Sequence, residues 1–296
     1  MSERVCVVIV TYNRKDLLRE CLNAVLAQTR PPDHVLVVDN ASTDGTSEML
    51  KEEFPHVEVL RLPENQGSAG GYHEGMRRAY EMGFDWLWIM DDDGLPERGA
   101  LQRLMSNAPE LEFKGCLVLA KGEKDRLAFG VPVPGKAELE HDFNNVLNAY
   151  PEGIIEGYVN LFNGCLLHRR VISKIGFPLK ELFIWGDEAE YFLRSKRCGI
   201  KMATLIEARF WHPEDRQARK TLRFFSFVVN LRYVEDDSRF YLILRNNVYY
   251  NAAYFSLFRA TAKAILYLFI FPNKAPIIFQ AMKDALSLLR RRKPPC

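Results

Sequence analysis

The first hundred residues alternate short apolar runs with segments whose apolar residues recur at helical spacing. Residues 5–10 form a continuous, mostly β-branched run, which is typical of a strand covered on both faces. Residues 16–27 carry apolar side chains at helical spacing, and two prolines close that helix. The same signals predict strands at residues 35–38, 57–62 and 86–90 and a helix at residues 71–82. This order predicts a parallel, doubly wound sheet with helices on its faces.

The pattern becomes less regular in the second hundred residues. It predicts, in order, a strand at residues 116–120, mostly loop at 121–151, a strand at 161–167 and a helix at 188–198. Gly199 is expected to stop that helix. From about residue 216 the chain is rich in aromatic and basic residues and is predicted to be helical.

Polar clusters follow three of the predicted strands, at residues 11–14, 39–46 and 91–93. In open α/β sheets, ligands bind beyond the carboxyl ends of the strands. Because parallel strands end at the same edge of a sheet, we expect these clusters to converge.

Three consecutive aspartates, Asp91, Asp92 and Asp93, end the apolar run at residues 86–90. Alternate side chains of an extended backbone share a face, so Asp91 and Asp93 are expected to point one way and Asp92 the other. Two carboxylates on one side suit Mg²⁺ or Mn²⁺. The alternative is a solvated acidic turn, since Gly94 follows.

Two further loops lead from a strand into a helix. Asp39 ends the second strand, where an acidic residue can accept hydrogen bonds from a nucleobase or a ribose. Asp44 and Thr46 are interpreted as caps of the next helix. Residues 65–71 are mostly small and precede a helix N-terminus, which favours anions. They lack the spacing of a dinucleotide or P-loop motif, so a phosphate cradle and a tight turn both stay open.

Carboxylates cluster at the start of the helix predicted at 188–198. They either stabilise the helix dipole or supply a general base that removes a proton from an attacking hydroxyl. Asp187 and Glu188 are neighbours on a helix, so they cannot both face one substrate atom. His212, beside Pro213, is either a loop residue or a third metal ligand.

Residues 276–292 form a basic amphipathic pattern, with Lys283, Arg290 and Arg291 mainly off the apolar face. Such a helix suits an anionic membrane surface. It equally suits packing on the core or on a partner chain, and both interpretations stay open.

The composition narrows the classes of protein to which the chain can belong. The chain has 296 residues, is 48% hydrophobic and carries a net charge of +2, so nothing in it demands nucleic acid. Six cysteines lie without a close pair, which predicts neither a zinc site nor a disulfide framework and favours a reducing compartment. Cys6 and Cys165 are predicted core residues. A polar N-terminus and the lack of a long apolar stretch predict a cytosolic globular protein.

Together these stretches resemble family 2 glycosyltransferases with a GT-A fold. The resemblance covers about residues 4–215 and depends on the order of four segments, at residues 8–14, 37–46, 65–71 and 91–93. The stretch 65–75 followed by 88–93, and the later Leu244-Arg245-Asn246, look most like the bacterial galactofuranosyl- and rhamnosyltransferase-like branch.

The resemblance implies an α/β fold with a Rossmann-like, mostly parallel central sheet flanked by helices and a C-terminal helical extension. The catalytic domain is expected at residues 1–215, with a nucleotide-sugar-binding half at 1–100 and an acceptor half at 101–215. A basic, amphipathic helical region is expected at 216–296.

The resemblance also implies roles for individual residues. Glu188 is the expected base and Asp187 the second candidate, although the family's acidic pair usually ends in aspartate. Asp91, Asp93 and His212 are expected to hold Mn²⁺ or Mg²⁺, and Trp185 and Gly186 to contact the acceptor. Donor binding is expected at Thr11, Tyr12, Asn13, Arg14, Asp39, Asn65, Gly67, Gly70 and Asp92.

The predicted activity is that of an inverting glycosyltransferase. It moves galactofuranose or rhamnose from a UDP- or dTDP-sugar to a hydroxyl of a cell-surface glycan or lipid-linked acceptor. The processive-synthase motif Gln-x-x-Arg-Trp is absent. The rivals are a metal-dependent nucleotidyltransferase and a non-catalytic glycan- or membrane-binding scaffold. The expected location is the cytoplasm or the inner face of a membrane, and the oligomeric state stays open.

Overall fold

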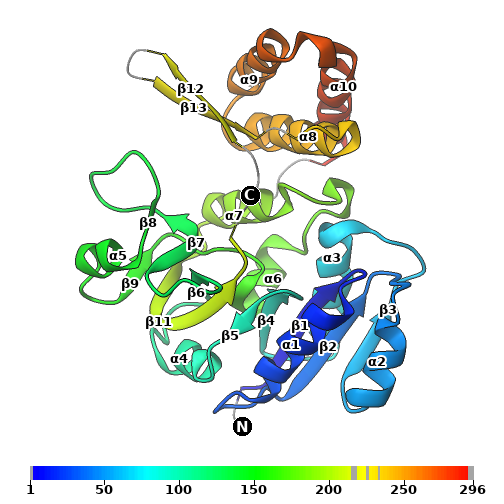
Figure 1. Cartoon of the computed structure of the whole chain (residues 1–296), viewed down its shortest axis with the longest axis vertical. Coiled ribbons are helices and arrows are strands. Elements are labelled where there is room, and N and C mark those ends of the chain that lie inside the picture. The colour runs from blue at the N-terminus through cyan, green and yellow to red at the C-terminus, as the bar shows by residue number, and fades with distance from the viewer. Residues whose placement is uncertain (1–2, 215–218, 225–226, 233, 293–296) are drawn as a thin grey trace. The chain divides into compact units, whose positions relative to one another are not determined.

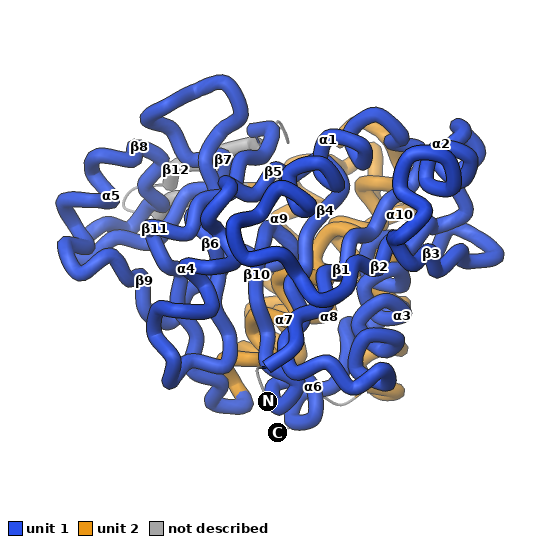
Figure 2. The backbone as a smooth tube through the Cα atoms, turned by 90° about the horizontal axis from the view of Figure 1, so that it is seen from below, with its two compact units in different colours: residues 1–180, 198–214 blue, residues 181–197, 215–296 orange. Residues whose placement is uncertain are grey.

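The computed structural model describes residues 3–214, 219–224, 227–232 and 234–292 (Figure 1). The chain divides into two units, which Figure 2 colours separately. Unit 1 comprises Met1–Lys180 and Cys198–Glu214, and unit 2 comprises Glu181–Arg197 and Asp215–Cys296.

Unit 1 is built around one mixed sheet. Its strands are β1 (Val5–Thr11), β2 (His34–Asp39), β3 (Glu58–Arg61), β4 (Trp86–Asp91), β5 (Leu95–Pro96), β6 (Phe113–Ala120), β7 (Arg126–Val131), β8 (Glu140–Asp142), β9 (Ile154–Glu156), β10 (Asn163–His168) and β11 (Met202–His212). Its helices are α1 (Lys15–Leu26), α2 (Thr46–Glu53), α3 (Gly67–Glu81), α4 (Ala100–Ser106), α5 (Phe143–Ala149) and α6 (Arg169–Ile175).

The strand order is β3-β2-β1-β4-β10-β6-β11-β5. The first four strands pair in parallel, as the sequence predicted. The later half is mixed, because β10 runs antiparallel to both β4 and β6, whereas β11 is parallel to β6. The carboxyl ends of β1, β2 and β4 therefore meet at one edge, as expected.

The two faces of β1 have different neighbours, as the two-residue period of a strand requires. Val5, Val7 and Ile9 belong to one core cluster with apolar residues of α1, α2 and α4. On the other face α3 approaches closely. A Cβ on Gly71 would lie 2.4 Å from Val10 Cγ1, so this helix–strand contact requires glycine.

The segment predicted as mostly loop, residues 121–151, contains β7, β8 and α5 instead. These elements are short, and they bury a second small apolar cluster that includes Leu127, Val131 and Val146. Periodicity cannot identify elements of three to seven residues reliably, which explains the error.

The cysteines agree only partly with expectation. Cys6 and Cys165 are buried free thiols, as predicted for core residues. Burial raises the pKa of Cys165 to about 12, so its thiol is inert. Cys198 takes part in a disulfide, which the scattered spacing did not predict.

Unit 2 combines one internal helix with the C-terminal part of the chain. It contains part of η1 (Lys180–Leu182), then α7 (Asp187–Arg197), β12 (Arg219–Phe224), β13 (Phe227–Arg232), α8 (Asp237–Tyr254), α9 (Leu257–Ile270), η2 (Pro272–Lys274) and α10 (Ala275–Arg291). The β12–β13 hairpin corrects the expectation that the region after residue 216 is helical from its start. Gly199, just beyond α7, has φ +67° and stops that helix as predicted.

The amphipathic segment predicted at 276–292 corresponds to α10. Its Ile278, Ala281 and Ala285 are buried, and the helix packs against α8. Packing within unit 2 therefore accounts for that apolar face.

Among the described residues no single helix has the length and composition of a membrane span. Leu257–Ile270 and Pro272–Arg291 meet those criteria only as a pair, which bends by 114°.

Candidate functional site

The acidic triplet lies where β4 ends. Asp91 is the last residue of that strand, and its amide donates to the carbonyl of Phe162 at 2.8 Å. Its Oδ1 accepts a 2.6 Å hydrogen bond from the buried Tyr72 hydroxyl. The Tyr72 ring stacks on Phe162, with centroids 3.9 Å apart and planes 9° apart. Asp91 is therefore oriented by an aromatic pair that sequence reasoning missed.

His212, the last residue of β11, reaches the triplet as predicted. Its Nε2 lies 3.0 Å from Asp93 Oδ1, and its Nδ1 lies 2.6 Å from the carbonyl of Pro213. One ligand atom each from Asp91, Asp93 and His212 lie within 4.8 Å of one another. These three side chains thus form a candidate metal group in unit 1.

Asp92 points elsewhere, as the alternation predicted. It is buried, and its Oδ2 accepts a 2.7 Å hydrogen bond from Thr11 Oγ1. Arg14 Nη1 lies 3.2 Å from Asp92 Oδ1 and 2.8 Å from Asp93 Oδ2, with its own side chain half-exposed. Thr11 and Arg14 therefore tie the end of β1 to the triplet. Tyr12 between them is 43% exposed.

The electrostatics show an excess of buried negative charge. Burial, reinforced by Asp93, raises the pKa of Asp91 to about 7, and burial raises the pKa of Asp92 to about 6. Burial would also raise the pKa of Asp93, but His212 and Arg14 outweigh it and lower that pKa. Burial would lower the pKa of His212, but Asp93, Asp91 and the Pro213 carbonyl together outweigh it, so that pKa is raised. A bound cation would relieve this repulsion.

The donor atoms fit a divalent ion. Two carboxylates and an imidazole are a ligand set suited to Mn²⁺, and Mg²⁺ also prefers carboxylate oxygens. Asp93 Oδ1 is buried, and no donor among the described residues is aligned to hydrogen-bond it. This oxygen still forms an ion pair with His212 Nε2 at 3.0 Å, so its lost water is only partly replaced, and a metal ion would supply a further bond.

The loop after β2 is held by Asp39. This fully buried carboxylate accepts hydrogen bonds from Ser42 N at 2.8 Å, Ser47 Oγ at 3.0 Å and Arg61 Nη1 at 2.5 Å. The sequence did not identify Arg61, which lies at the end of β3. Asp39 thus lies at the predicted sheet edge, and the contact predicted with a nucleobase stays a prediction.

Asn13, also predicted to bind the donor, connects β1 to this loop. Its backbone amide donates to Ser42 Oγ at 3.0 Å, and its side-chain Oδ1 accepts from Thr43 N at 2.7 Å.

Thr46 was interpreted as a helix cap, but Gly45 occupies the N-cap position of α2 without a side-chain hydrogen bond. Asp44 instead accepts from Thr46 N at 3.2 Å.

The stretch 65–71 forms the first turn of α3, which begins at Gly67 rather than at 71. Asn65 Oδ1 accepts from Gly67 N at 2.9 Å, and Asn40 Nδ2 donates to the carbonyl of Gly67 at 2.9 Å. A Cβ on Gly70 would lie 2.4 Å from Gln66 Cβ. These contacts account for a tight turn, and donor binding by Asn65, Gly67 and Gly70 stays a prediction.

The acidic pair belongs to unit 2, at the start of α7. Asp187 is buried, and Glu188 Oε2 accepts a 2.9 Å hydrogen bond from the amide of Gly186. The preceding loop has a strained backbone, with φ +61° at Trp185 and +63° at Phe183. Such strain persists only where surrounding contacts over-determine the conformation.

Asn246 of α8 supplies those contacts. Its Nδ2 lies 2.8 Å from the carbonyl oxygen of Leu182, 2.9 Å from that of Ile184 and 3.1 Å from that of Trp185. Arg245 Nη2 donates to the carbonyl of Leu182 at 3.0 Å. The Arg245-Asn246 dipeptide noted in the sequence is thus the support of the loop before the acidic pair.

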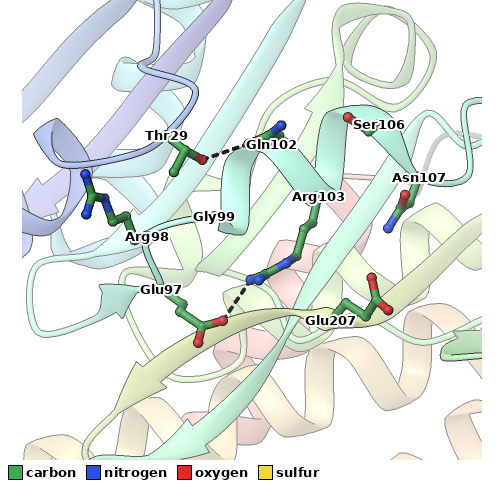
Figure 3. Close-up of a pocket in the computed structure, with 9 residues that line it drawn as sticks. All are labelled: Thr29, Glu97, Arg98, Gly99, Gln102, Arg103, Ser106, Asn107 and Glu207. Atoms are coloured by element: carbon green, nitrogen blue, oxygen red, sulfur yellow. Dashed lines mark hydrogen bonds and ion pairs between the residues drawn. The ribbon is translucent and has the colours of Figure 1, made fainter.

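A separate hollow of about 550 Å³ lies in unit 1 beside α4 (Figure 3). It is open and polar, and an ion pair between Arg103 and Glu97 crosses part of it. Its lining residues are Thr29, Glu97, Arg98, Gly99, Gln102, Arg103, Ser106, Asn107 and Glu207. None of the residues predicted to carry the chemistry lines it.

The sequence resembles known glycosyltransferases over most of its length. Residues 6–141 match the family model described as glycosyl transferase family 2. The galactofuranosyltransferase GlfT1 of Mycolicibacterium smegmatis is 31% identical over 253 residues, which cover 84% of this chain and 83% of the relative. GlfT1 of Mycobacterium tuberculosis is 33% identical over 218 residues, covering 72% of this chain and 71% of the relative.

Solved structures confirm the fold. The mannosyltransferase PcManGT from Pyrobaculum calidifontis, in complex with GDP-Man and Mn²⁺, matches with a TM-score of 0.55 at 20% identity and covers 97% of this chain and 76% of its own. TarS of S. aureus, in complex with UDP-GlcNAc, matches with a TM-score of 0.57 at 15% identity, covering 95% and 80%. The GT-A architecture implied by the sequence is confirmed. With relatives above 30% identity over most of its length, the chain belongs to glycosyltransferase family 2.

Proposed function

We propose that this protein is a metal-dependent, inverting galactofuranosyltransferase. The donor is UDP-galactofuranose, and the acceptor is a hydroxyl of a cell-surface glycan built on a lipid carrier. The observation that carries the proposal is the convergence of Asp91, Asp93 and His212 at the carboxyl edge of the sheet. The relatives named as galactofuranosyltransferases support the choice of sugar over rhamnose.

The metal group lies where a donor diphosphate binds in an open α/β sheet, beyond the carboxyl ends of the strands. Mn²⁺ or Mg²⁺ held by Asp91, Asp93 and His212 would neutralise the charge that develops on the departing diphosphate. Arg14 adds a half-exposed guanidinium beside the same carboxylates. Asp92 and Thr11 fix the end of β1, so that Arg14 is held in place.

Glu188 is the proposed general base. It takes the proton from the acceptor hydroxyl while that oxygen forms a bond to the anomeric carbon. The bond from the anomeric carbon to the diphosphate oxygen breaks, and the nucleoside diphosphate leaves with the electron pair. Attack from the opposite face inverts the configuration. Proton removal by a positioned carboxylate contributes about 10²–10⁴-fold to such a rate.

Asp187 is buried, whereas Glu188 is partly exposed and bonded to the Gly186 amide of its own loop. A base must reach a substrate hydroxyl, so the exposure favours Glu188. Trp185 and Gly186 are the proposed acceptor contacts. The proposed location is the cytoplasmic face of the membrane, where lipid-linked acceptors are presented.

The test separates donor binding from transfer. Calorimetric titration with UDP should require Mn²⁺ in the wild type, and Asp93→Asn should weaken that metal-dependent binding at least about tenfold. Glu188→Gln should bind UDP and Mn²⁺ like the wild type while losing about 10²-fold or more in turnover. Glu207→Gln, an exposed carboxylate of β11 outside the group, is the matched control.

Three results would overturn the proposal. Turnover of the Asp93→Asn protein at the wild-type rate would remove the metal role. Full activity of Glu188→Gln together with inactivity of Asp187→Asn would move the base to Asp187. Transfer from dTDP-rhamnose but not from UDP-galactofuranose would replace the sugar while leaving the mechanism.

A further inference from the structure

Helix α9 carries apolar side chains on both of its faces. The face that packs within unit 2 uses Ala260, Ala264 and Tyr267, which are at most 1% exposed. The opposite face presents large side chains, listed with their exposed fractions: Phe258 at 83%, Ile265 at 57% and Phe269 at 81%. A surface helix in water normally turns polar residues outward. Here two alanines and a tyrosine face inward, and bulky apolar side chains also face outward.

The exposed side chains form one continuous stripe. Phe258, Ala262, Ile265 and Phe269 recur with steps of four, three and four residues, which places them on one side of a helix. The region around the stripe adds Phe255, Leu257 and, on α10, Phe279, each at least half-exposed. Six of the eleven large hydrophobic side chains that are exposed in the described chain lie between residues 255 and 279. This concentration marks an interaction surface.

The charge around the stripe is positive. Residues 257–291 contain six lysines and arginines, of which Lys274 is buried and paired with Asp237, and a single acidic residue, Asp284. The net charge of the whole chain is only +2, so cationic character is concentrated in this segment. A second copy of the chain would bring the same cations against each other. An anionic surface complements both the charge and the apolar stripe.

The geometry favours lying in a bilayer interface over crossing it. At 1.5 Å per residue the 14 residues of α9 extend about 21 Å, short of the roughly 30 Å hydrocarbon core. The chain then bends by 114° into the segment Pro272–Arg291. A short helix with one apolar face outward and cations near it is the pattern of an interfacial helix.

We propose that the outward face of α9 inserts into the interfacial layer of an anionic phospholipid bilayer. Phe258, Ile265 and Phe269 enter the acyl boundary, and the cations of α9 and α10 lie at the headgroups. The membrane-facing helix is thus α9, and not the segment 276–292 that the sequence pattern suggested, whose apolar face packs on α8. This binding is a property of the protein without donor or acceptor, so it goes beyond the proposed transfer reaction.

The experiment is sedimentation of the full chain with vesicles. One set is pure phosphatidylcholine, and the other contains about one third phosphatidylglycerol. The wild type is expected to bind the anionic vesicles, and binding should weaken as salt rises above about 0.1 M. The triple variant Phe258→Ser, Ile265→Ser, Phe269→Ser should lower the partition coefficient at least about 100-fold. Lys283→Gln, Arg290→Gln and Arg291→Gln should lower it about fivefold for each cation removed.

The matched control is Leu139→Ser with Leu147→Ser, two exposed leucines of unit 1. Their removal should leave vesicle binding within about twofold of the wild type. All substitutions lie at exposed positions, and an unchanged thermal midpoint establishes that each variant is folded. A second reporter is Phe258→Trp, whose fluorescence should be quenched by brominated lipid, whereas Leu139→Trp should not be.

Several results would overturn the inference. Retention of wild-type vesicle binding by the triple variant would place the membrane contact elsewhere. Equal binding to neutral and anionic vesicles would remove the role of the cations. Concentration-dependent dimerisation that the triple variant abolishes, without vesicle binding, would assign the stripe to a second copy. By contrast, a protein that binds vesicles but transfers no sugar would leave this inference standing, and only the proposed function would fail.

Discussion

Replacing Asn246 with alanine should release the loop that precedes the acidic pair. The Asn246 side chain is fully buried, and its amide nitrogen lies within 3.1 Å of three carbonyl oxygens, those of Leu182, Ile184 and Trp185. An amide nitrogen carries two hydrogens, so the three contacts amount to about two full hydrogen bonds. Alanine removes both donors and leaves the carbonyl groups inside the protein.

The magnitude follows from these contacts. Each buried hydrogen bond contributes about 1 kcal/mol, and each carbonyl left without a donor costs about 1–3 kcal/mol. Water entering the vacated space can satisfy part of that loss. We therefore expect the free energy of unfolding to fall by about 2–5 kcal/mol. The positive φ angles of Phe183 and Trp185 should relax once the tether is gone, because each is costly by itself.

The assay is steady-state release of the nucleoside diphosphate at a temperature where circular dichroism shows the variant folded. Moving a reacting group by about 1 Å can cost about 10²-fold in rate, so kcat should fall by that order while the KM for the donor stays near its wild-type value. The matched control is Asn251→Ala. Asn251 is also buried in α8, but its Nδ2 donates to the carbonyl of Asn247 within the same helix, at 2.7 Å.

The comparison between the two variants decides whether Asn246 supports turnover or only the stability of the fold. Asn251→Ala should lose stability but keep turnover per folded molecule within about twofold. The reasoning is wrong if Asn246→Ala retains wild-type kcat, or if both variants lose the same fraction of activity. In the second case the helix would matter for stability alone.

Three further predictions test other parts of the fold and site. Gly71→Ala should destabilise unit 1 by about 1–3 kcal/mol in urea unfolding, because its Cβ would meet Val10 Cγ1 at 2.4 Å; an unchanged midpoint would show that α3 can shift freely. Tyr72→Phe should weaken Mn²⁺ binding about tenfold by calorimetry, because Asp91 loses its orienting donor, and unaltered affinity would refute that role. Burial lowers the pKa of Lys114 from 10.5, so its stabilising contribution is present above pH 10.5 and is lost as pH falls through the folded value. The stability of the wild type relative to Lys114→Met should therefore rise as pH increases toward 10.5, and a flat difference would contradict it.

The N-terminal half of the fold could be predicted because its strands are buried on both faces. β1 and β4 are continuous apolar runs. The segments between the strands carry apolar residues at helical spacing, and strands that alternate with helices indicate a parallel sheet. The antiparallel insertion of β10 between β4 and β6 could not be predicted in the same way. Strand direction depends on a long-range pairing, and an apolar run has the same composition in either direction.

The candidate site was predictable as far as local geometry reaches. Alternation along an extended chain placed Asp91 and Asp93 together and Asp92 apart, and the structure agrees. Tyr72 and Arg61 escaped notice because their partners lie 19 and 22 residues away in sequence. Nothing in the residues around a tyrosine within a helix indicates which strand end its hydroxyl will meet.

The course of the chain links the C-terminal helices to the proposed catalytic base. Residues 181–197 belong to unit 2, although the segments on both sides belong to unit 1. In unit 2 the loop before the acidic pair is held by Asn246, and Glu190 of α7 is held by Arg194 and by the Tyr254 hydroxyl at 2.5 Å. The stretch that matches the family model, residues 6–141, contains none of these groups. Substitutions in α8 should thus alter turnover while the metal group of unit 1 stays intact.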